Sequence, residues 1–413
     1  MVGQKKLNIG IIGGSISGCI AAMLLGRAGH SVNVYERSAS GLIGRGGGVA
    51  TSRKLLNELR ANDVLDTDFP ATPFSELKMS KWTDNDPYVG RCPLSKAIDM
   101  HCVHWSGLWE NLRKRVPDAA YHRGRTLVDA RADDTGKVTL SFSDGQTELV
   151  DLVLFADGYQ SLGRKLLFPD IDISYRGYAV WRGVLPDSEV DDLAPLSQHP
   201  RYSFKTIKGS FVSYIVPSRE GSVEPGQRTI NWAAYIPLPE DQVADFMIDN
   251  EGRSRQGSIP SGSMREEQDA DLKALMAREL PRYYSDILAK SKGNQIQLIY
   301  TSSLPAYGKG RMALIGDAGM VVQPLTGAGV FKGYTNVRDL LVMLQSHDDV
   351  DAALESWSEE ETRIAHRMLE LGGELEEAFI WNTIDLASAS SEECERWWEK
   401  SITVPEEFSY FAA

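Results

Sequence analysis

The chain has few of the residues that build metal centres or disulfide frameworks. Only four of its 413 residues are cysteine and seven are histidine. The cysteines (Cys19, Cys92, Cys102 and Cys394) form no CxxC pair, and no histidine–cysteine cluster has the spacing of a zinc site. We therefore predict no metal ion. Scattered thiols without a recognisable signal peptide favour a cytoplasmic location.

Positive charge and long apolar runs are also scarce. The 57 acidic residues exceed the 44 Lys and Arg, which gives a net charge of -13. No basic patch stands out that could neutralise the phosphates of a nucleic acid. The apolar run that begins at Leu7 is too short to span a membrane. We expect neither a nucleic-acid nor a membrane partner, and the sequence leaves a homodimer open.

The first recognisable sequence pattern is a strand, a turn and a helix near the N-terminus. Leu7–Ile12 is an unbroken apolar strand, GGSISG occupies Gly13–Gly18, and helical spacing follows up to Arg27. Ser31–Tyr35 then alternates like a second strand. Such a βαβ unit predicts a parallel sheet.

The GGSISG turn has the features of a dinucleotide-binding motif. Gly13 permits a tight turn and Gly18 allows close packing of the helix on the sheet, whereas Ser15 replaces the usual middle glycine. Glu36 follows about twenty residues later, where a carboxylate can accept hydrogen bonds from a ribose. The turn predicts a dinucleotide but does not distinguish NAD from FAD.

Two further glycine-rich turns follow apolar strands. ADGYQSLGR covers Ala156–Arg164 after the strand Leu149–Phe155, and GDAGMVVQPLTGAG covers Gly316–Gly329 after the strand Arg311–Ile315. Asp157 can cap backbone amides in such a turn. The helix that begins at the end of the last motif can stabilise the negative charge of a reduced flavin. The third motif therefore favours a flavin.

The composition changes between the second and third motifs. From Ser174 to Pro237, strands rich in aromatic residues alternate with turns, which predicts an inserted antiparallel sheet. We expect an FAD-binding domain at 1–170 and 295–345, a substrate domain at 171–294 and C-terminal helices at 346–413. We expect Ser254–Ser263 to form a mobile surface loop. Further helices are expected at Glu267–Lys290, Gly327–Gln345, Glu355–Gly372 and Glu374–Leu386.

The order of the three motifs resembles that of the flavin-dependent aromatic hydroxylases, the single-component FAD monooxygenases related to 4-hydroxybenzoate hydroxylase. The resemblance covers about residues 7–345, and Ile11–Gly18 and Gly177–Val184 resemble the dihydroxypyridine hydroxylase branch. It implies an α/β fold with a Rossmann-like FAD-binding domain and an inserted antiparallel sheet. It further implies that FAD, NAD(P)H and O2 hydroxylate an electron-rich phenolic or hydroxypyridine-like ring through a C4a-hydroperoxyflavin.

The resemblance also implies which residues meet the cofactor. Ser15 would lie at the pyrophosphate, Glu36 at the adenosine ribose and Asp317 at the ribityl chain. The residues expected to bind FAD are Gly13, Ser15, Gly18, Glu36, Arg37, Gly48, Val49, Asp157, Asp317, Leu325, Gly327, Ala328 and Gly329.

The aromatic sheet is the expected roof of the substrate pocket. The residues expected to act on the substrate are Pro324, Tyr214, Arg182 and Tyr178. Arg182 could pair with an acidic or enolate substrate. Other aromatic side chains of this segment, such as Trp181, Tyr202 and Trp232, are expected to pack within the sheet more often than to face a ligand.

Some features leave alternatives open. Trp105, Met320 and Phe331 stand where the family commonly has arginine, histidine and asparagine, which suits one branch of the family or a flavin-binding protein without catalysis. Glu36 followed by the glycine-rich segment 44–48 would also suit an FAD amine oxidase. A flavin halogenase would require a WxWxIP stretch, which the sequence lacks.

Overall fold

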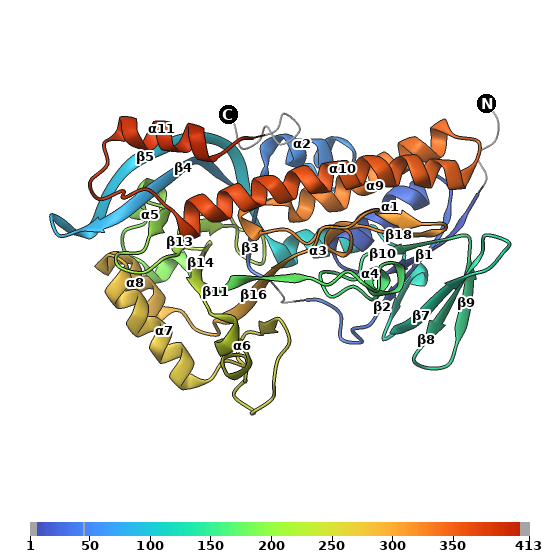
Figure 1. The fold of residues 1–413 in the computed structure, drawn as a ribbon, viewed down its shortest axis with the longest axis horizontal. Helices are drawn as coiled ribbons and strands as arrows, with labels where there is room; N and C mark the ends of the chain where they lie inside the picture. Colours follow the sequence, from blue (N-terminus) through green and yellow to red (C-terminus); the bar gives the residue numbers. More distant parts are fainter. Residues whose placement is uncertain (1–5, 44–45, 405–413) are drawn as a thin grey trace.

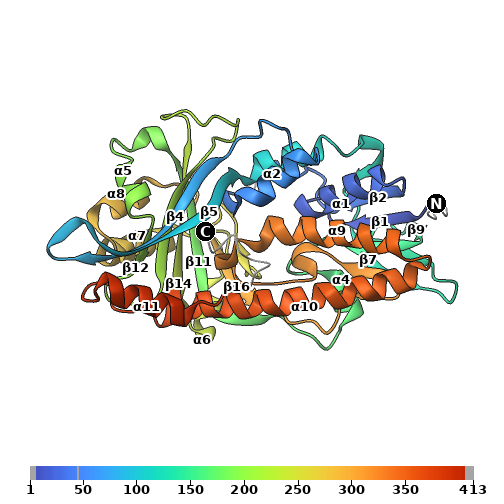
Figure 2. The same ribbon diagram turned by 90° about the horizontal axis from the view of Figure 1, so that it is seen from above.

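The computed structural model describes residues 6–43 and 46–404 (Figures 1 and 2). Gly44 and Arg45, on which the amine oxidase alternative partly rests, lie outside these residues, as does the C-terminal segment Ser409–Ala413. A six-stranded sheet lies toward the end that holds the N-terminus, and a nine-stranded sheet forms the opposite end. Within the described residues, no helix combines the length and the apolar character needed to cross a membrane.

The six-stranded sheet contains the predicted βαβ unit. In spatial order its strands are β17 (Gly308–Lys309), β18 (Met312–Leu314), β10 (Leu152–Phe155), β1 (Asn8–Ile12), β2 (Ser31–Glu36) and β6 (Tyr121–Arg123). All neighbours pair in parallel except β17, which is antiparallel to β18. The predicted parallel sheet is confirmed, although the expected strand Leu149–Phe155 divides into the end of β9 and all of β10.

The two faces of this sheet follow the alternation of β1. Ile9 and Ile11 are buried in one core with helix α1 (Ile16–Arg27) and helix α9 (Ala328–Ser346). On the other face, Gly10 lies against a small antiparallel sheet, because a methyl group on it would come within 2.8 Å of Leu140. That small sheet consists of β7 (Leu127–Ala132), β8 (Val138–Phe142) and β9 (Thr147–Val150).

The nine-stranded sheet is larger than the sequence predicted. In spatial order its strands are β15 (Ser258–Ile259), β16 (Gln295–Thr301), β11 (Ser174–Pro186), β14 (Thr229–Pro237), β13 (Ser210–Val216), β12 (Arg201–Ser203), β4 (Thr72–Thr83), β5 (Asp86–His104) and β3 (Gly48–Ser52). The pairings among β11, β12, β13, β14 and β16 are antiparallel, as expected. β3, β4, β5 and β16 come from outside the expected segment 171–294, and the long β4–β5 hairpin was not predicted.

Two helix predictions need correction. The expected helix Glu267–Lys290 is interrupted at Pro281, which leaves α7 (Glu266–Glu279) and α8 (Arg282–Lys290), because proline lacks the N–H that a helix interior needs. The expected break near Gly373 is absent. One helix, α10 (Val350–Glu376), runs through it and continues as a π-helical turn, η5 (Glu377–Trp381).

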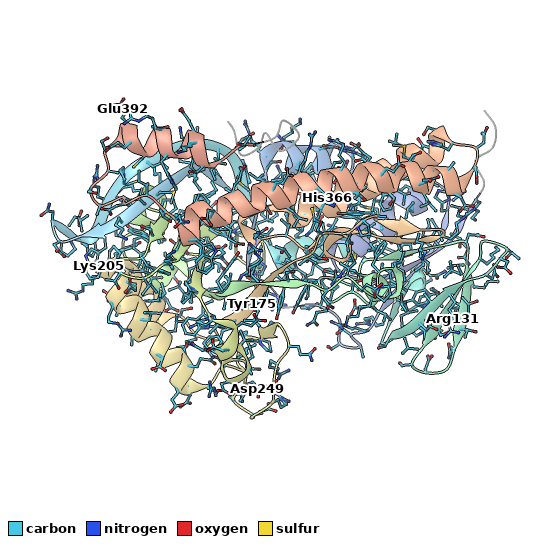
Figure 3. The ribbon with its side chains drawn as sticks, in the orientation of Figure 1. Arg131, Tyr175, Lys205, Asp249, His366 and Glu392 are labelled. Carbon is cyan, nitrogen blue, oxygen red and sulfur yellow. The ribbon has the colours of Figure 1, made fainter. Side chains whose placement is uncertain are left out.

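The other α-helices are short. They are α2 (Arg53–Ala61), α3 (Trp105–Arg113), α4 (Leu162–Leu167), α5 (Ala194–Gln198), α6 (Glu240–Phe246) and α11 (Ser391–Ser401). The segment predicted as a mobile loop, Ser254–Ser263, is anchored on both sides. Arg255 donates to the buried carboxylate of Asp249 (labelled in Figure 3) at 2.6 Å, and β15 within the segment pairs with β16.

A buried polar chain joins α10 to the third glycine-rich motif. The Glu361 carboxyl group, 1% exposed, accepts a hydrogen bond from the Asn336 side chain at 2.6 Å. The Asn336 side-chain oxygen in turn accepts from the N–H of Gly316 at 2.8 Å. Burial, with a smaller contribution from the charge of Asp339, raises the pKa of Glu361 to about 8. The carboxyl group therefore stays protonated in the folded protein at neutral pH.

This shifted pKa predicts how stability depends on pH. The unfolded chain releases the Glu361 proton near 4.5, whereas the folded protein holds it to about 8. The unfolded state therefore binds fewer protons between these values, and the free energy of unfolding falls as pH rises through this window. In Glu361→Gln, which carries no such proton, we expect a smaller fall in melting temperature between pH 5 and pH 8. Glu359→Gln, at an exposed position of the same helix, is the control and should follow the wild type; equal pH slopes for all three proteins would refute the assignment.

Candidate functional site

The three glycine-rich motifs meet at one edge of the six-stranded sheet. They follow the carboxyl ends of β1, β10 and β18, which are adjacent parallel strands. The N–H of Ala156 donates to Ile12 at 2.7 Å, and a methyl group on Gly13 would lie 2.4 Å from the carbonyl oxygen of Ala156. A methyl group on Gly316 would lie 2.3 Å from the hydroxyl of Ser17. Turns far apart in the sequence are therefore in direct contact.

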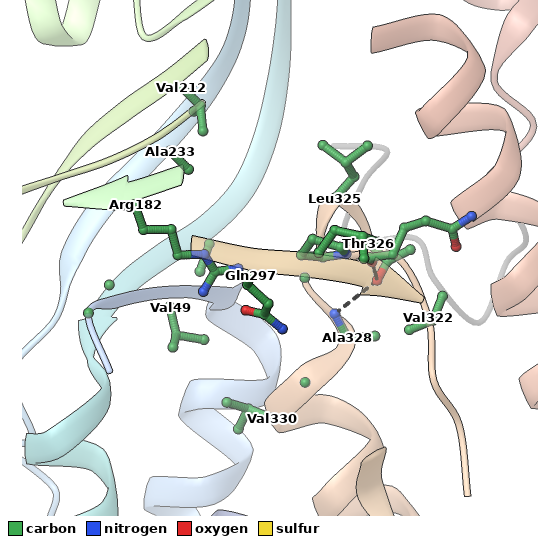
Figure 4. A pocket seen from close by; sticks show the side chains of 18 of the residues that line it. Val49, Arg182, Val212, Ala233, Gln297, Val322, Leu325, Thr326, Ala328 and Val330 are labelled. Carbon is green, nitrogen blue, oxygen red and sulfur yellow. Dashed lines mark hydrogen bonds between the residues drawn. The ribbon is translucent and has the colours of Figure 1, made fainter. Parts of the chain in front are cut away.

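Two helix N-termini face one cavity at this edge. Helix α1 begins at Ile16; Ser15 supplies no side-chain cap, and the first turn carries no acidic residue. Helix α9 begins after Gly327, whose φ of 63° is in the left-handed region that glycine adopts readily. Here the Thr326 hydroxyl accepts a hydrogen bond from the N–H of Ala328 at 3.3 Å (Figure 4). Helix N-termini carry partial positive charge and attract anionic groups.

The cavity has a volume of about 480 Å³ and extends from these turns to one face of the nine-stranded sheet. Most of the predicted site residues line it. Those on its wall are Ser15, Gly48, Val49, Arg182, Tyr214, Asp317, Pro324, Leu325, Gly327, Ala328 and Gly329. The structure thus brings together residues from all three motifs and from the aromatic sheet.

Glu36 and Arg37 do not line the cavity. The buried Glu36 carboxylate accepts hydrogen bonds from the N–H groups of Gly14 and Ser38, at 2.9 and 2.8 Å. It thereby links the end of β2 to the first glycine-rich turn. Arg37 is exposed. Gly13 and Gly18 also lie behind the wall, where each makes a close backbone contact rather than presenting an atom to the cavity.

Asp157 stands just behind the wall as well. Its Oδ2 accepts from the N–H of Leu162 at 2.7 Å and so caps the start of α4. Its Oδ1 is buried and has no hydrogen-bond partner among the described residues. Burial raises the pKa of this carboxyl group. Its chain neighbours Ala156 and Gly158 both line the cavity.

Tyr178, the fourth residue expected to act on the substrate, lies away from the cavity wall. It shares a sheet face with Arg182, but the end of the long C-terminal helix covers its part of that face. Its hydroxyl donates to the buried Glu376 carboxylate at 3.5 Å, and the Trp381 ring stands edge-on to it at 6.1 Å. Strand alternation places Tyr178 and Arg182 on one face, whereas the covering helix could not be inferred from the sequence of the strand.

Two further wall residues, Lys332 and Asn231, had no signal in the sequence. Lys332, which is buried, forms an ion pair of 2.5 Å with Asp317 and donates to the Met320 carbonyl at 2.7 Å. Asn231 accepts from the N–H of Gly48 at 2.7 Å and holds the glycine-rich segment against the sheet. Tyr214 donates to the carbonyl of Gly48 at 3.2 Å. Burial raises the pKa of Tyr214, so its hydroxyl stays protonated.

Three other aromatic residues of the inserted segment pack away from the cavity. Trp181, Tyr202 and Trp232 belong to the core on the other side of the nine-stranded sheet, in agreement with the packing interpretation. His104 accepts from the N–H of Ser106 at 3.2 Å and caps helix α3. The unusual Trp105 lines the cavity.

Comparisons with known proteins agree with this geometry. A family model described as FAD binding domain-like matches residues 175–301. The chain is 27% identical to a 2,6-dihydroxypyridine 3-monooxygenase of Paenarthrobacter nicotinovorans, over 87% of this chain and 88% of that protein. It is 26% identical to a 3-amino-4-hydroxybenzoate 2-monooxygenase of Streptomyces cremeus, over 83% and 80%. Over most of its length the chain is similar to flavin-dependent aromatic hydroxylases.

The solved structures show the same fold. The 2,6-dihydroxypyridine-3-hydroxylase of Arthrobacter nicotinovorans superposes with a TM-score of 0.81 at 24% sequence identity, over 94% of this chain and 97% of that one. This likeness confirms the predicted combination of an FAD-binding fold with an antiparallel sheet. The cofactor of the family is FAD.

The close contact between Gly18 and Gly13 gives a direct test of whether the first glycine-rich turn binds FAD. A methyl group on Gly18 would lie 1.9 Å from the Gly13 carbonyl oxygen, so Gly18→Ala must displace the turn from the N-terminus of α1. We expect FAD to bind roughly tenfold or more weakly, which fluorescence titration of the apoprotein would measure. Gly26→Ala in the same helix is the matched control, because nothing lies within 4 Å of the added methyl group. Wild-type affinity in Gly18→Ala would contradict the expected role of the turn.

Proposed function

We propose that this enzyme uses FAD, NAD(P)H and O2 to hydroxylate an electron-rich aromatic or N-heteroaromatic ring. The observation that carries the proposal is the shared cavity. Its one end is formed by the three glycine-rich turns, and its other end by a sheet face that presents Arg182 and Tyr214. A dinucleotide and a flat substrate thereby have adjoining places in one cavity.

The donor set at the turns suits FAD. The uncapped N-terminus of α1 at Ser15 would hold the pyrophosphate, because its free N–H groups and dipole favour anionic oxygens. The Asp317 carboxylate would accept from the ribityl hydroxyls while Lys332 fixes its position. The N-terminus of α9, after Gly327, would face the electron-accepting end of the flavin ring. When bound, FAD supplies the hydride transfer and the oxygen chemistry, which no protein side chain can provide.

The protein's own task is then to position the ring and to exclude water. Pro324 fixes the backbone entering the turn next to the cavity, because its φ is restricted. The protonated Tyr214 hydroxyl and the Arg182 guanidinium would contact the polar substituents of the ring. A nearby cation favours ionisation of a ring hydroxyl, and that ionisation raises the electron density of the ring carbons.

The decisive experiment is a substrate screen with the purified protein. We expect a yellow protein whose NAD(P)H consumption rises when a hydroxypyridine or a phenol is added, with a product one oxygen atom heavier by mass spectrometry. Hydrogen peroxide is measured in parallel, because uncoupled oxidation consumes NAD(P)H without product. Tight FAD binding with no stimulation and no product for any ring would instead favour a flavin-binding protein without catalysis. A protein that could not be reconstituted with FAD would overturn both.

The Asp317–Lys332 pair gives a second prediction. We expect Asp317→Ala to weaken FAD retention by about tenfold, since it removes an acceptor for the ribityl chain and leaves the charge of Lys332 unpaired. The side chain of Asp317 is half exposed, so the fold should tolerate the change. Asp351→Ala, which removes a surface pair with Arg311, is the control and should retain FAD normally. The measurement is the FAD remaining after dialysis, and equal retention by both variants would refute the role.

A further inference from the structure

Two arginines on the sheet face of the cavity have no acidic partner among the residues that the structure describes. Arg201 is 7% exposed and Arg182 is partly buried, and both line the cavity. Among the described residues, neither lies within 4 Å of a carboxylate oxygen, and the Nε atoms of both are buried without a hydrogen-bond partner. The acidic residue on the described wall, Asp317, is already paired with Lys332.

The contacts of Arg201 do not neutralise it. Its Nη1 approaches the Ser210 hydroxyl at 3.4 Å, which is a weak hydrogen bond to a neutral group. Its guanidinium lies 4.6 Å from the centre of the Phe379 ring and 6.0 Å from that of Tyr235. Burial lowers the pKa of Arg201, but a guanidinium stays charged at neutral pH even so. A buried charge without a partner is costly, so an arginine here calls for an anion that the protein does not supply.

The strand register places the two arginines at opposite ends of one row. Arg201 on β12 is opposite Val212 on β13, Val212 is opposite Ala233 on β14, and Ala233 is opposite Arg182 on β11. Residues directly opposite in antiparallel strands lie on the same face. Three strand spacings of about 4.8 Å set the two arginine backbones roughly 14 Å apart.

The middle of this row is shaped for a flat ring. Val212 and Ala233 are small and apolar and both line the cavity, so they form a shelf between the two cations (Figure 4). Tyr235 and Tyr214 line the cavity two residues to either side of the shelf, on the same sheet face. The row therefore offers an apolar surface with one guanidinium at each end.

Arg201 is poorly placed to serve the cofactor. Its contacts come from the nine-stranded sheet and, through Phe379, from the turn that ends the long C-terminal helix. None of the glycine-rich turns contributes to them. Arg201 is thus placed for a substrate at the sheet end of the cavity rather than for the cofactor.

We infer that Arg201 binds an anionic substituent of the substrate, which lies with its ring on the Val212–Ala233 shelf and its hydroxyl toward Arg182. The inference rests on the proposed function and narrows it. The substrate class is a hydroxylated aromatic or heteroaromatic ring with a second, ionised acidic group, either a carboxylate or a deprotonated ring hydroxyl. Arg201 is thereby a specificity-determining residue that contacts the substrate.

Matched pairs of anionic and neutral ligands test for this anion site in the wild-type holoenzyme. We would measure the dissociation constants of a hydroxybenzoate and its hydroxybenzamide, and of a hydroxynicotinate and its hydroxynicotinamide, by titration calorimetry in the absence of NAD(P)H. Each pair has nearly the same shape and differs in charge. The carboxylates are expected to bind roughly 10- to 100-fold more tightly. A dihydroxypyridine titrated across its own ionisation tests the other source of the anion: tighter binding of its anion, with no carboxylate preference, would assign the site to a ring oxygen.

Variants of Arg201 test whether this residue produces the preference for anionic ligands. In Arg201→Gln the preference for the anionic member is expected to disappear, with a larger rise in KM than fall in kcat, and Arg201→Lys should restore part of it. Arg282→Gln, at an exposed position of α8, should keep the wild-type preference. Should Arg201→Gln fail to fold, the wild-type ligand pairs still decide the matter.

The outcomes separate this inference from the function on which it rests. Equal affinity for the neutral and anionic members of every pair, together with hydroxylation of neutral rings, would overturn the inference and leave the hydroxylase function standing. A holoenzyme that binds the anions but hydroxylates none of the rings tested would overturn the proposed function while supporting the anion site. Retention of the full preference in Arg201→Gln would show that another group binds the anion, which would refute the assignment to Arg201.

Discussion

The parallel pairing of β1, β10 and β18 is the constraint on which the rest of the site depends. Parallel strands end at the same edge of a sheet, so the turns that follow them must meet there. The close approaches at Gly13 and Gly316 leave no room for a methyl group, and the atoms they meet belong to another motif. The glycines are therefore required by contact between turns as well as by a ligand. This explains why Gly13 and Gly18 lie behind the cavity wall, whereas Ser15 lies on it.

A second constraint comes from the C-terminal end of α10. The buried Glu376 carboxylate accepts from the Gln323 side chain at 2.9 Å and from the Trp381 indole at 3.2 Å, and Arg176 on β11 pairs with it at 2.8 Å. One carboxylate thus joins the nine-stranded sheet, the end of the helix and the turn that leads to Pro324. Satisfied buried networks of this kind hold their elements in a fixed arrangement. The position of the turn beside the cavity therefore depends on a helix that the sequence motifs do not include.

Local patterns were sufficient for the elements that the sequence predicted well. The βαβ unit, the third motif and the aromatic strands each depend on spacing within about 30 residues. The β4–β5 hairpin was missed because prolines, Pro73, Pro87 and Pro93 among them, interrupt its alternation. Arg201, Asn231 and Glu376 gave no signal because each acts through strand register or through a distant helix. The pairing register of four strands places Arg201 and Arg182 in one row. No local sequence pattern reveals that register.

The net charge of the whole chain would have suggested a cationic ligand. A net charge of -13 opposes anions at long range, but salt screens surface charges beyond about 8 Å at physiological ionic strength. Inside the cavity that screening is weak, and the local field is set by Arg182, Arg201 and two helix N-termini, against the single paired carboxylate on the described wall. The sign of a ligand follows from the charges that surround it, because Coulomb energies grow as the dielectric falls and the distance shortens. An acidic protein can therefore bind an anionic ring, provided that its cations line a cavity from which water is largely excluded.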